Sequence, residues 1–167
     1  MDLKWDYELK EHQNPNPVVF TKKIDLDAEG VFCPNEQSIL KVFKTDGFKL
    51  QTWGRTPNKL EDDPHYIGVR RTTHLHIDPK YPRYSHHLKI RVDMGIGCRG
   101  LNKESLMFER GTFYILDTHS PHQVFIHDAY KKLKPEWNIA VSIDSSTPID
   151  PEEAISRCIE YAKENPF

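Results

Sequence analysis

Short apolar runs that alternate with polar residues dominate the chain from about residue 48 onward. Alternation with a period of two is typical of β-strands with one buried face, and turn-rich segments separate the runs. The pattern predicts strands at residues 18–26, 48–53, 66–77, 86–96, 106–109, 111–117, 122–126 and 137–144. Many short strands with regular turns indicate a mainly β fold, either a sandwich or a barrel.

Two segments instead show the spacing of helices. Residues 34–47 carry a compact apolar face, with Asn35 placed to cap the start and Gly47 placed to stop the end. The second helix is predicted over residues 150–164, where Asp150 is the N-cap and Pro151 takes the first turn. Its apolar residues form one stripe, which we expect to pack against the outside of the sheet: Ala154, Ile155, Cys158, Ile159 and Ala162.

Composition narrows the class of protein. The 167 residues fit one domain, residues 1–167, in which residues 1–17 with their "NPNP" ending form an N-terminal arm. A net charge of −2 offers no basic field for sequence-independent nucleic-acid binding, and no apolar run is long enough to span a bilayer. The three cysteines are far apart without a CxxC motif, which predicts a cytoplasmic protein with structural thiols.

Histidine is concentrated in "THLHIDPKYPRYSHHLKI", residues 73–90, which hold four of the nine histidines. On a strand, His74, His76 and Asp78 share one face, so they are candidate metal ligands. A third or fourth ligand is expected from "DTHSPH", where His122 opens the next strand and His119 is a second option. Two imidazoles and one carboxylate suit iron, manganese or zinc, and leave positions open for substrate.

These motifs resemble the non-haem iron(II) and 2-oxoglutarate-dependent dioxygenases, in particular their aspartyl/asparaginyl β-hydroxylase-like branch. The resemblance spans roughly residues 68–144 through "HID", "HHLKI" and "GTFYILDTHSPHQV". It implies a double-stranded β-helix, the jelly-roll barrel of the cupins, that holds iron(II) through His76, Asp78 and His122. It also implies that 2-oxoglutarate contacts His87 and the basic Arg83, and that an unactivated C–H bond is hydroxylated. The resemblance implies a substrate that is either a peptide or protein side chain or a small molecule.

The chain departs from this family where the cosubstrate's distal carboxylate needs a cation. The family carries Arg or Lys on the strand after the distal histidine, but the aligned residue here is Asn138, and counting on from His122 reaches Lys132. Strand alternation also puts Lys89 and Arg91 on the face of His87. We expect Arg91 to take the role, because a guanidinium pairs with a carboxylate through two hydrogen bonds.

The same region is also similar to the cupins. Gly68, His74 and His76 match the first half of that family's first motif, and the spacing from Gly111 to His122 matches the second. This alternative implies a metal held by His74, His76 and His122, without 2-oxoglutarate. Both resemblances imply the same barrel.

Overall fold

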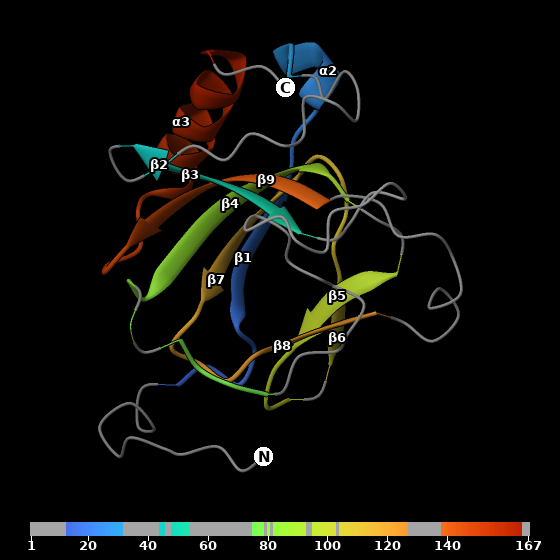
Figure 1. Cartoon of the computed structure of the whole chain (residues 1–167), viewed down its shortest axis with the longest axis vertical. Coiled ribbons are helices and arrows are strands. Elements are labelled where there is room, and N and C mark those ends of the chain that lie inside the picture. Colours follow the sequence, from blue (N-terminus) through green and yellow to red (C-terminus); the bar gives the residue numbers. More distant parts are fainter. Residues whose placement is uncertain are drawn as a thin grey trace, which may run out of the picture.

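The computed structural model describes residues 13–31, 44–45, 48–53, 75–78, 80, 82–92, 95–102, 104–126 and 138–164. These residues form a mainly β structure with a C-terminal helix, as the alternation predicted (Figure 1). The elements in chain order are β1 (Val18–Lys23), α2 (Leu26–Glu29), β2 (Lys44–Thr45), β3 (Phe48–Trp53), β4 (Tyr84–Arg91), β5 (Ile96–Arg99), β6 (Ser105–Met107), β7 (Thr112–Asp117), β8 (Gln123–Ile126), β9 (Asn138–Ser145) and α3 (Pro151–Glu164).

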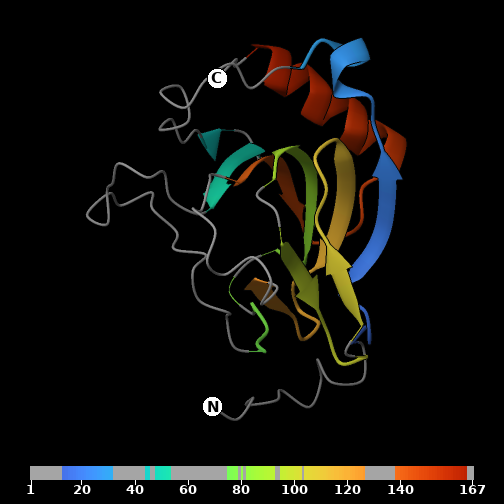
Figure 2. The same cartoon turned by 90° about the vertical axis from the view of Figure 1, so that its right-hand side faces the viewer.

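The strands form two antiparallel sheets. The larger has six strands in the order β1-β7-β4-β9-β3-β2, and the smaller has three in the order β6-β5-β8. Both views place α2 and α3 at one end of the molecule and the small sheet at the other (Figures 1 and 2). The large sheet therefore separates the helices from the small sheet.

Each face of the large sheet carries its own apolar cluster. On one face, α3 packs over β4, β7 and β9 and buries Leu88, Phe113, Val141, Ile155 and Cys158 among others. The second cluster joins the large sheet to the small one and includes Ile96, Cys98, Phe108, Tyr114 and Leu116. We call the space around this second cluster the interior. Strand β4 lies inside the large sheet and is buried over most of its length, because its side chains point alternately toward the first and the second cluster.

The C-terminal helix confirms its prediction closely. It runs from Pro151 to Glu164, and the backbone N–H of Glu153 donates to the Asp150 side chain at 3.2 Å. The residues it buries, Ala154, Ile155, Cys158 and Ala162, lie on the predicted stripe. An N-cap of this kind satisfies a backbone donor that the first helical turn leaves without a partner.

The predicted helix at residues 34–47 is wrong at its C-terminal end. Lys44 and Thr45 form strand β2, which pairs antiparallel with β3 through Lys44–Lys49 and Thr45–Phe48. The sequence between the two strands is Asp46-Gly47, a dipeptide favoured in two-residue hairpin loops. In sequence, glycine is a signal for both a helix stop and a hairpin turn, and the pairing with β3 makes Lys44 and Thr45 a strand. Residues 34–43 of this prediction lie outside the described part of the chain.

Other strand boundaries differ from the predicted ones where the chain crosses from one sheet to the other. The strand predicted at residues 86–96 is two strands, β4 in the large sheet and β5 in the small one, with Gly95 at a φ of 84° between them. The predicted strand ended at residue 96, yet β5 continues through Gly97 to Arg99. A Cβ at Gly97 would lie 2.4 Å from the Leu106 carbonyl oxygen, so the close approach of β6 requires glycine there.

The first predicted strand also ends early, and a short helix follows it. Strand β1 stops at Lys23, and the Asp25 side chain then caps α2 by accepting from the Ala28 N–H at 3.1 Å. Of the strand predicted at residues 66–77, the described part contains only a single β-bridge at His76. Of the N-terminal arm, residues 13–17 are described, and no helix in the described ranges has the length and hydropathy to cross a membrane.

Candidate metal centre

Two segments far apart in the sequence are joined at the candidate site. His76 and His122 form an isolated antiparallel bridge in which each backbone N–H donates to the other's carbonyl, at 3.0 and 2.8 Å. The backbone N–H of Asp78 donates to the Thr118 carbonyl at 2.8 Å. These bonds extend the pairing beyond β8, so the segment 76–78 lies alongside the turn that follows β7.

The side chains of these residues converge. The His76 Nε2 and His122 Nε2 atoms each lie 3.4 Å from one of the two Asp78 carboxylate oxygens, and the imidazole centroids are 4.4 Å apart. The three ligand atoms lie within 4.8 Å of one another, and they are the only such group among the described residues. Two neutral imidazoles and a carboxylate at this spacing can bind one divalent cation.

Solvent exposure differs sharply among the three residues. The His122 side chain is 6% exposed, whereas those of Asp78 and His76 are 31% and 39% exposed. The set therefore has a buried side and an open side, from which a metal or a substrate can enter. Burial by itself would raise the pKa of Asp78, but hydrogen bonds and charge from His122 and His76 outweigh it and lower the pKa. The carboxylate is thus ionised at neutral pH, the form that binds a metal.

His122 is oriented by its own turn. Its Nδ1 lies 2.9 Å from the Ser120 carbonyl oxygen, which can only accept, so Nδ1 donates there and Nε2 is the ring nitrogen directed at Asp78. Val124, two residues further along, packs against the interior cluster. Side chains two apart on a strand share a face, so His122 faces the interior as well.

A buried carboxylate supports this turn. Asp117, which has no solvent exposure, ends β7 and accepts hydrogen bonds from Arg83, Asn14 and Ser120 and from the backbone N–H of His119. Burial would raise the pKa of Asp117, but these bonds and the Arg83 charge lower it. The guanidinium of Arg83, which we expected to contact a cosubstrate, is therefore engaged with the turn that carries His122.

The interior face of β4 carries further polar groups. His87 is 1% exposed, and neither of its ring nitrogens has a hydrogen-bond partner among the described residues. Lys89, two residues further on, is 2% exposed, and its ammonium lies 4.2 Å from the centre of the Phe108 ring. Opposite His87 on β9 lies Ser142, whose buried hydroxyl likewise has no partner in the described chain.

Arg91 does not continue this alternation. The pairing of β4 with β9 shifts register between Lys89 and Arg91, so Arg91 lies opposite Ile139. Ile139 belongs to the cluster under α3, and cross-strand partners share a face. The expectation that Arg91 lies on the face of His87 is therefore wrong, because a bulge intervenes.

The remaining predicted residues are partly outside the described structure. His74 and Lys132 lie in segments that are not described, and of Asn138 only the backbone is, opposite Trp53 at the start of β9. His119 is half-buried in the turn and is not one of the three clustered residues. Sequence analysis did not single out Ser142, whereas the polar alternation in "HHLKI" did place Lys89 on the face of His87.

Comparison with known proteins adds nothing to this assignment: no protein-family model matches the sequence, and no curated protein matches it. The geometry of the site is thus the basis for any functional conclusion.

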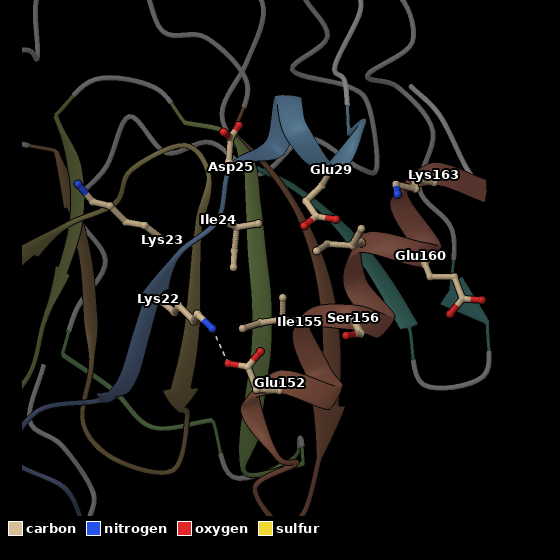
Figure 3. A pocket seen from close by; sticks show the side chains of 11 residues that line it. Lys22, Lys23, Ile24, Asp25, Glu29, Glu152, Ile155, Ser156, Glu160 and Lys163 are labelled. Atoms are coloured by element: carbon tan, nitrogen blue, oxygen red, sulfur yellow. Dashed lines mark hydrogen bonds and ion pairs between the residues drawn. The ribbon is translucent and has the colours of Figure 1, made fainter.

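A second hollow lies at the helical end of the molecule and has different chemistry. Side chains of β1, α2 and α3 line an open groove of about 570 Å³ (Figure 3). Both charge signs alternate along it, and Lys22 pairs with Glu152 across it. The charged side chains of the groove lie at the surface, whereas the interior holds buried polar atoms without a hydrogen-bond partner among the described residues. The candidate functional site is therefore the metal centre and the interior behind it.

Proposed function

We propose that the protein is a non-haem iron(II) and 2-oxoglutarate-dependent dioxygenase that hydroxylates an unactivated C–H bond. One observation carries the proposal, namely the convergence of His76, Asp78 and His122 with a buried side and an open side. Two histidines and one carboxylate with free positions are typical of iron(II) oxygenases. We propose a cytoplasmic location as well, in line with the unbridged thiols of Cys98 and Cys158.

The topology supports a double-stranded β-helix as the scaffold. From β3 onward the chain passes repeatedly between the two sheets, and strands β3, β4, β7 and β9 belong to the large one. Between β3 and β4 come residues 76–78, which lie beside the start of β8. Between β4 and β7 come β5 and β6 of the small sheet, and between β7 and β9 comes β8 of the same sheet. A jelly roll is wound in this way, with its ligands inside the mouth of the barrel. The candidate site joins residues 76–78 to the residues just before β8, an arrangement that supports this scaffold.

The donor set fits iron(II). His122 is held in one orientation by the Ser120 carbonyl, and Asp78 is ionised and held by the Thr118 carbonyl through its backbone. Bound iron(II) would supply the oxidising chemistry, in which 2-oxoglutarate, oxygen and a C–H bond yield succinate, carbon dioxide and an alcohol. The chain's own contribution is to orient the ligands, to exclude water from the interior and to neutralise the cosubstrate's carboxylates.

The donor set also favours this reading over the cupin alternative. In that alternative Asp78 has no role, yet its two oxygens lie between the two imidazoles at equal distances. The ligand specific to the alternative, His74, lies in a segment that is not described. The comparison of Asp78→Ala with His74→Ala therefore separates the two assignments.

Metal and cosubstrate binding test the proposal without knowledge of the substrate. Iron(II) added to the metal-free protein under anaerobic conditions should bind one ion per chain, and 2-oxoglutarate should then produce a visible charge-transfer band. Admission of oxygen should release succinate, slowly, in the absence of a substrate. Asp78→Ala should abolish metal binding, and His74→Ala should leave it intact. A protein that binds iron but gives neither band nor succinate would exclude 2-oxoglutarate chemistry, and loss of metal in His74→Ala alone would favour the cupin ligands.

A further inference from the structure

Two polar side chains, His87 and Lys89, lie in succession along the interior face of β4. The Arg83 carbonyl accepts from the Thr118 N–H and side chain, so the start of β4 is joined to the turn that carries His122. His87 and then Lys89 follow on the interior face of β4. Because residues two apart on a strand are about 6–7 Å apart, Lys89 lies one such step deeper than His87.

Three buried polar side chains meet in this deeper part of the interior. His87 is opposite Ser142 on β9 and opposite Tyr114 on β7, and Lys89 is opposite Ala140 on β9. Side chains directly opposite on antiparallel strands have Cβ atoms about 4.5–5.5 Å apart, so one small group can contact His87, Ser142 and Lys89 together. The side chain opposite Lys89 is the single methyl group of Ala140.

The polarity of this region requires a ligand that accepts hydrogen bonds. Ser142 and His87 have no partner among the described residues, and a buried polar atom without a partner costs about 1–3 kcal/mol. Burial, followed by the nearby Lys89 and His86, lowers the pKa of His87 well below its ordinary value, so its ring is neutral with one donor nitrogen. Lys89 brings an ammonium, with apolar and aromatic walls from Phe108, Ile96 and Cys98 around it. A cation, a hydroxyl and one N–H inside apolar walls match a carboxylate.

We propose that Lys89 and Ser142, with His87 beside them, bind the distal carboxylate of a dicarboxylate whose other end is at the metal centre, and that in this chain Lys89 replaces the cation the family carries after its distal histidine. The inference rests on the proposed function for the identity of the dicarboxylate, 2-oxoglutarate. A dicarboxylate fits this arrangement because one carboxylate would be bound at Lys89 while the other would bind at the metal centre.

The test compares variants of the full chain by calorimetric titration of 2-oxoglutarate into the metal-free protein and into the iron-loaded protein without oxygen. Lys89→Met keeps the length of the side chain and removes its charge, and it should weaken 2-oxoglutarate binding by about ten- to a hundredfold, while iron affinity stays within about twofold. Ser142→Ala should weaken it by about three- to tenfold. The matched control is Arg91→Met on the same strand, beyond the bulge, which should change binding less than about threefold.

A second readout does not depend on affinity. Lysine labelled with ¹³C at Cε gives an NMR signal for the Lys89 side chain, which is assigned by its loss in Lys89→Met. Addition of 2-oxoglutarate should shift this signal and raise the pH at which it titrates, because a bound carboxylate favours the charged ammonium.

The outcomes separate this inference from the proposed function. Normal 2-oxoglutarate binding by Lys89→Met, with an unmoved Lys89 signal in the wild type, overturns the anchor and leaves the dioxygenase proposal in place. If the chain does not bind 2-oxoglutarate but binds succinate, and Lys89→Met loses that binding, the carboxylate site is supported and the dioxygenase proposal is overturned. If neither 2-oxoglutarate nor succinate binds, the interior groups hold water only and both proposals fail.

Discussion

Arg83 donates to both carboxylate oxygens of Asp117, from Nε at 3.1 Å and from Nη2 at 2.8 Å. The pair links the residue before β4 to the end of β7, directly before the turn in which Ser120 orients His122. Bidentate pairs of this kind fix geometry as well as adding energy. An ion pair outside the metal centre thus determines where one of its ligands lies.

Arg83→Met should therefore damage both stability and metal binding. It leaves the Asp117 carboxylate buried without its counter-charge, and we expect a loss of about 2–3 kcal/mol in the free energy of unfolding. Displacement of the turn should lower metal affinity by about ten- to a hundredfold. Urea unfolding and a cobalt(II) titration measure the two effects.

The matched control for Arg83 is Arg110→Met. Arg110 pairs with Asp27 at 3.5 Å on the surface, where both side chains are exposed. Exposed pairs contribute little, so we expect a change under about 1 kcal/mol and unaltered metal affinity. Equal effects of the two substitutions would show that Asp117 does not depend on Arg83.

The metal ligands should differ from other histidines in how they respond to metal. In the wild type, added iron(II) or cobalt(II) should raise the melting temperature, because a ligand that binds only the folded state stabilises it. His76→Ala, Asp78→Ala and His122→Ala should each abolish this rise. His86→Gln is the control, since His86 bonds to the Ile143 carbonyl and the Ile149 N–H on the helix side of the sheet. A metal-induced rise that survives Asp78→Ala would remove the carboxylate from the site.

We expect the buried Lys89 to lower the free energy of unfolding of the protein without a ligand. Burial lowers the pKa of Lys89 from 10.5 to about 8, with the Cys98 sulfur acting in the opposite direction, so between these values the unfolded chain holds a proton that the folded chain has released. The free energy of unfolding therefore rises with pH across that window, by about 3 kcal/mol at 1.4 kcal/mol per pH unit. At pH 7 the full penalty is present, and Lys89→Met should be more stable than the wild type by up to about 3 kcal/mol.

Denaturant unfolding of both proteins from pH 7 to pH 11 measures this difference. Neighbouring groups titrate in an overlapping range: burial raises the pKa of Cys98 to about 12, and it also raises the pKa of Tyr114. Both are present in the two proteins, so their contributions largely cancel in the comparison. The advantage of Lys89→Met should shrink above pH 8 and vanish near pH 10.5. If the difference in the free energy of unfolding between Lys89→Met and the wild type does not change with pH, packing and not charge distinguishes the two proteins.

Cys98 and Cys158 should resist alkylation in the folded protein. Both are buried, and burial raises the pKa of each thiol to about 12. Only about one thiol in ten thousand is then a thiolate at pH 8, and access is blocked as well. Mass spectrometry after iodoacetamide treatment should find both unmodified until denaturant is added. Rapid labelling of either residue in native conditions would contradict the packing of its cluster.

The sequence by itself determined the local features of this protein. Alternation located the strands from β3 to β9 approximately, because the period of two is a property of each strand and needs no knowledge of its neighbours. Asp150 and Pro151 located the start of α3 for the same reason. The spacing of His76 and Asp78, with one residue between them, also predicted that their side chains share a face, and the two side chains do converge.

The tertiary structure decided everything that depends on which strands are neighbours. Whether Lys44 and Thr45 would end a helix or form a strand depended on β3, and the side of the sheet that Arg91 would take depended on a register shift against β9. The engagement of Arg83 with Asp117 joins positions 34 residues apart, and no local pattern encodes it. The physical reason is that side-chain direction follows from the backbone of one strand, whereas register, bulges and buried ion pairs are set by the contacts between strands that only the folded chain brings together.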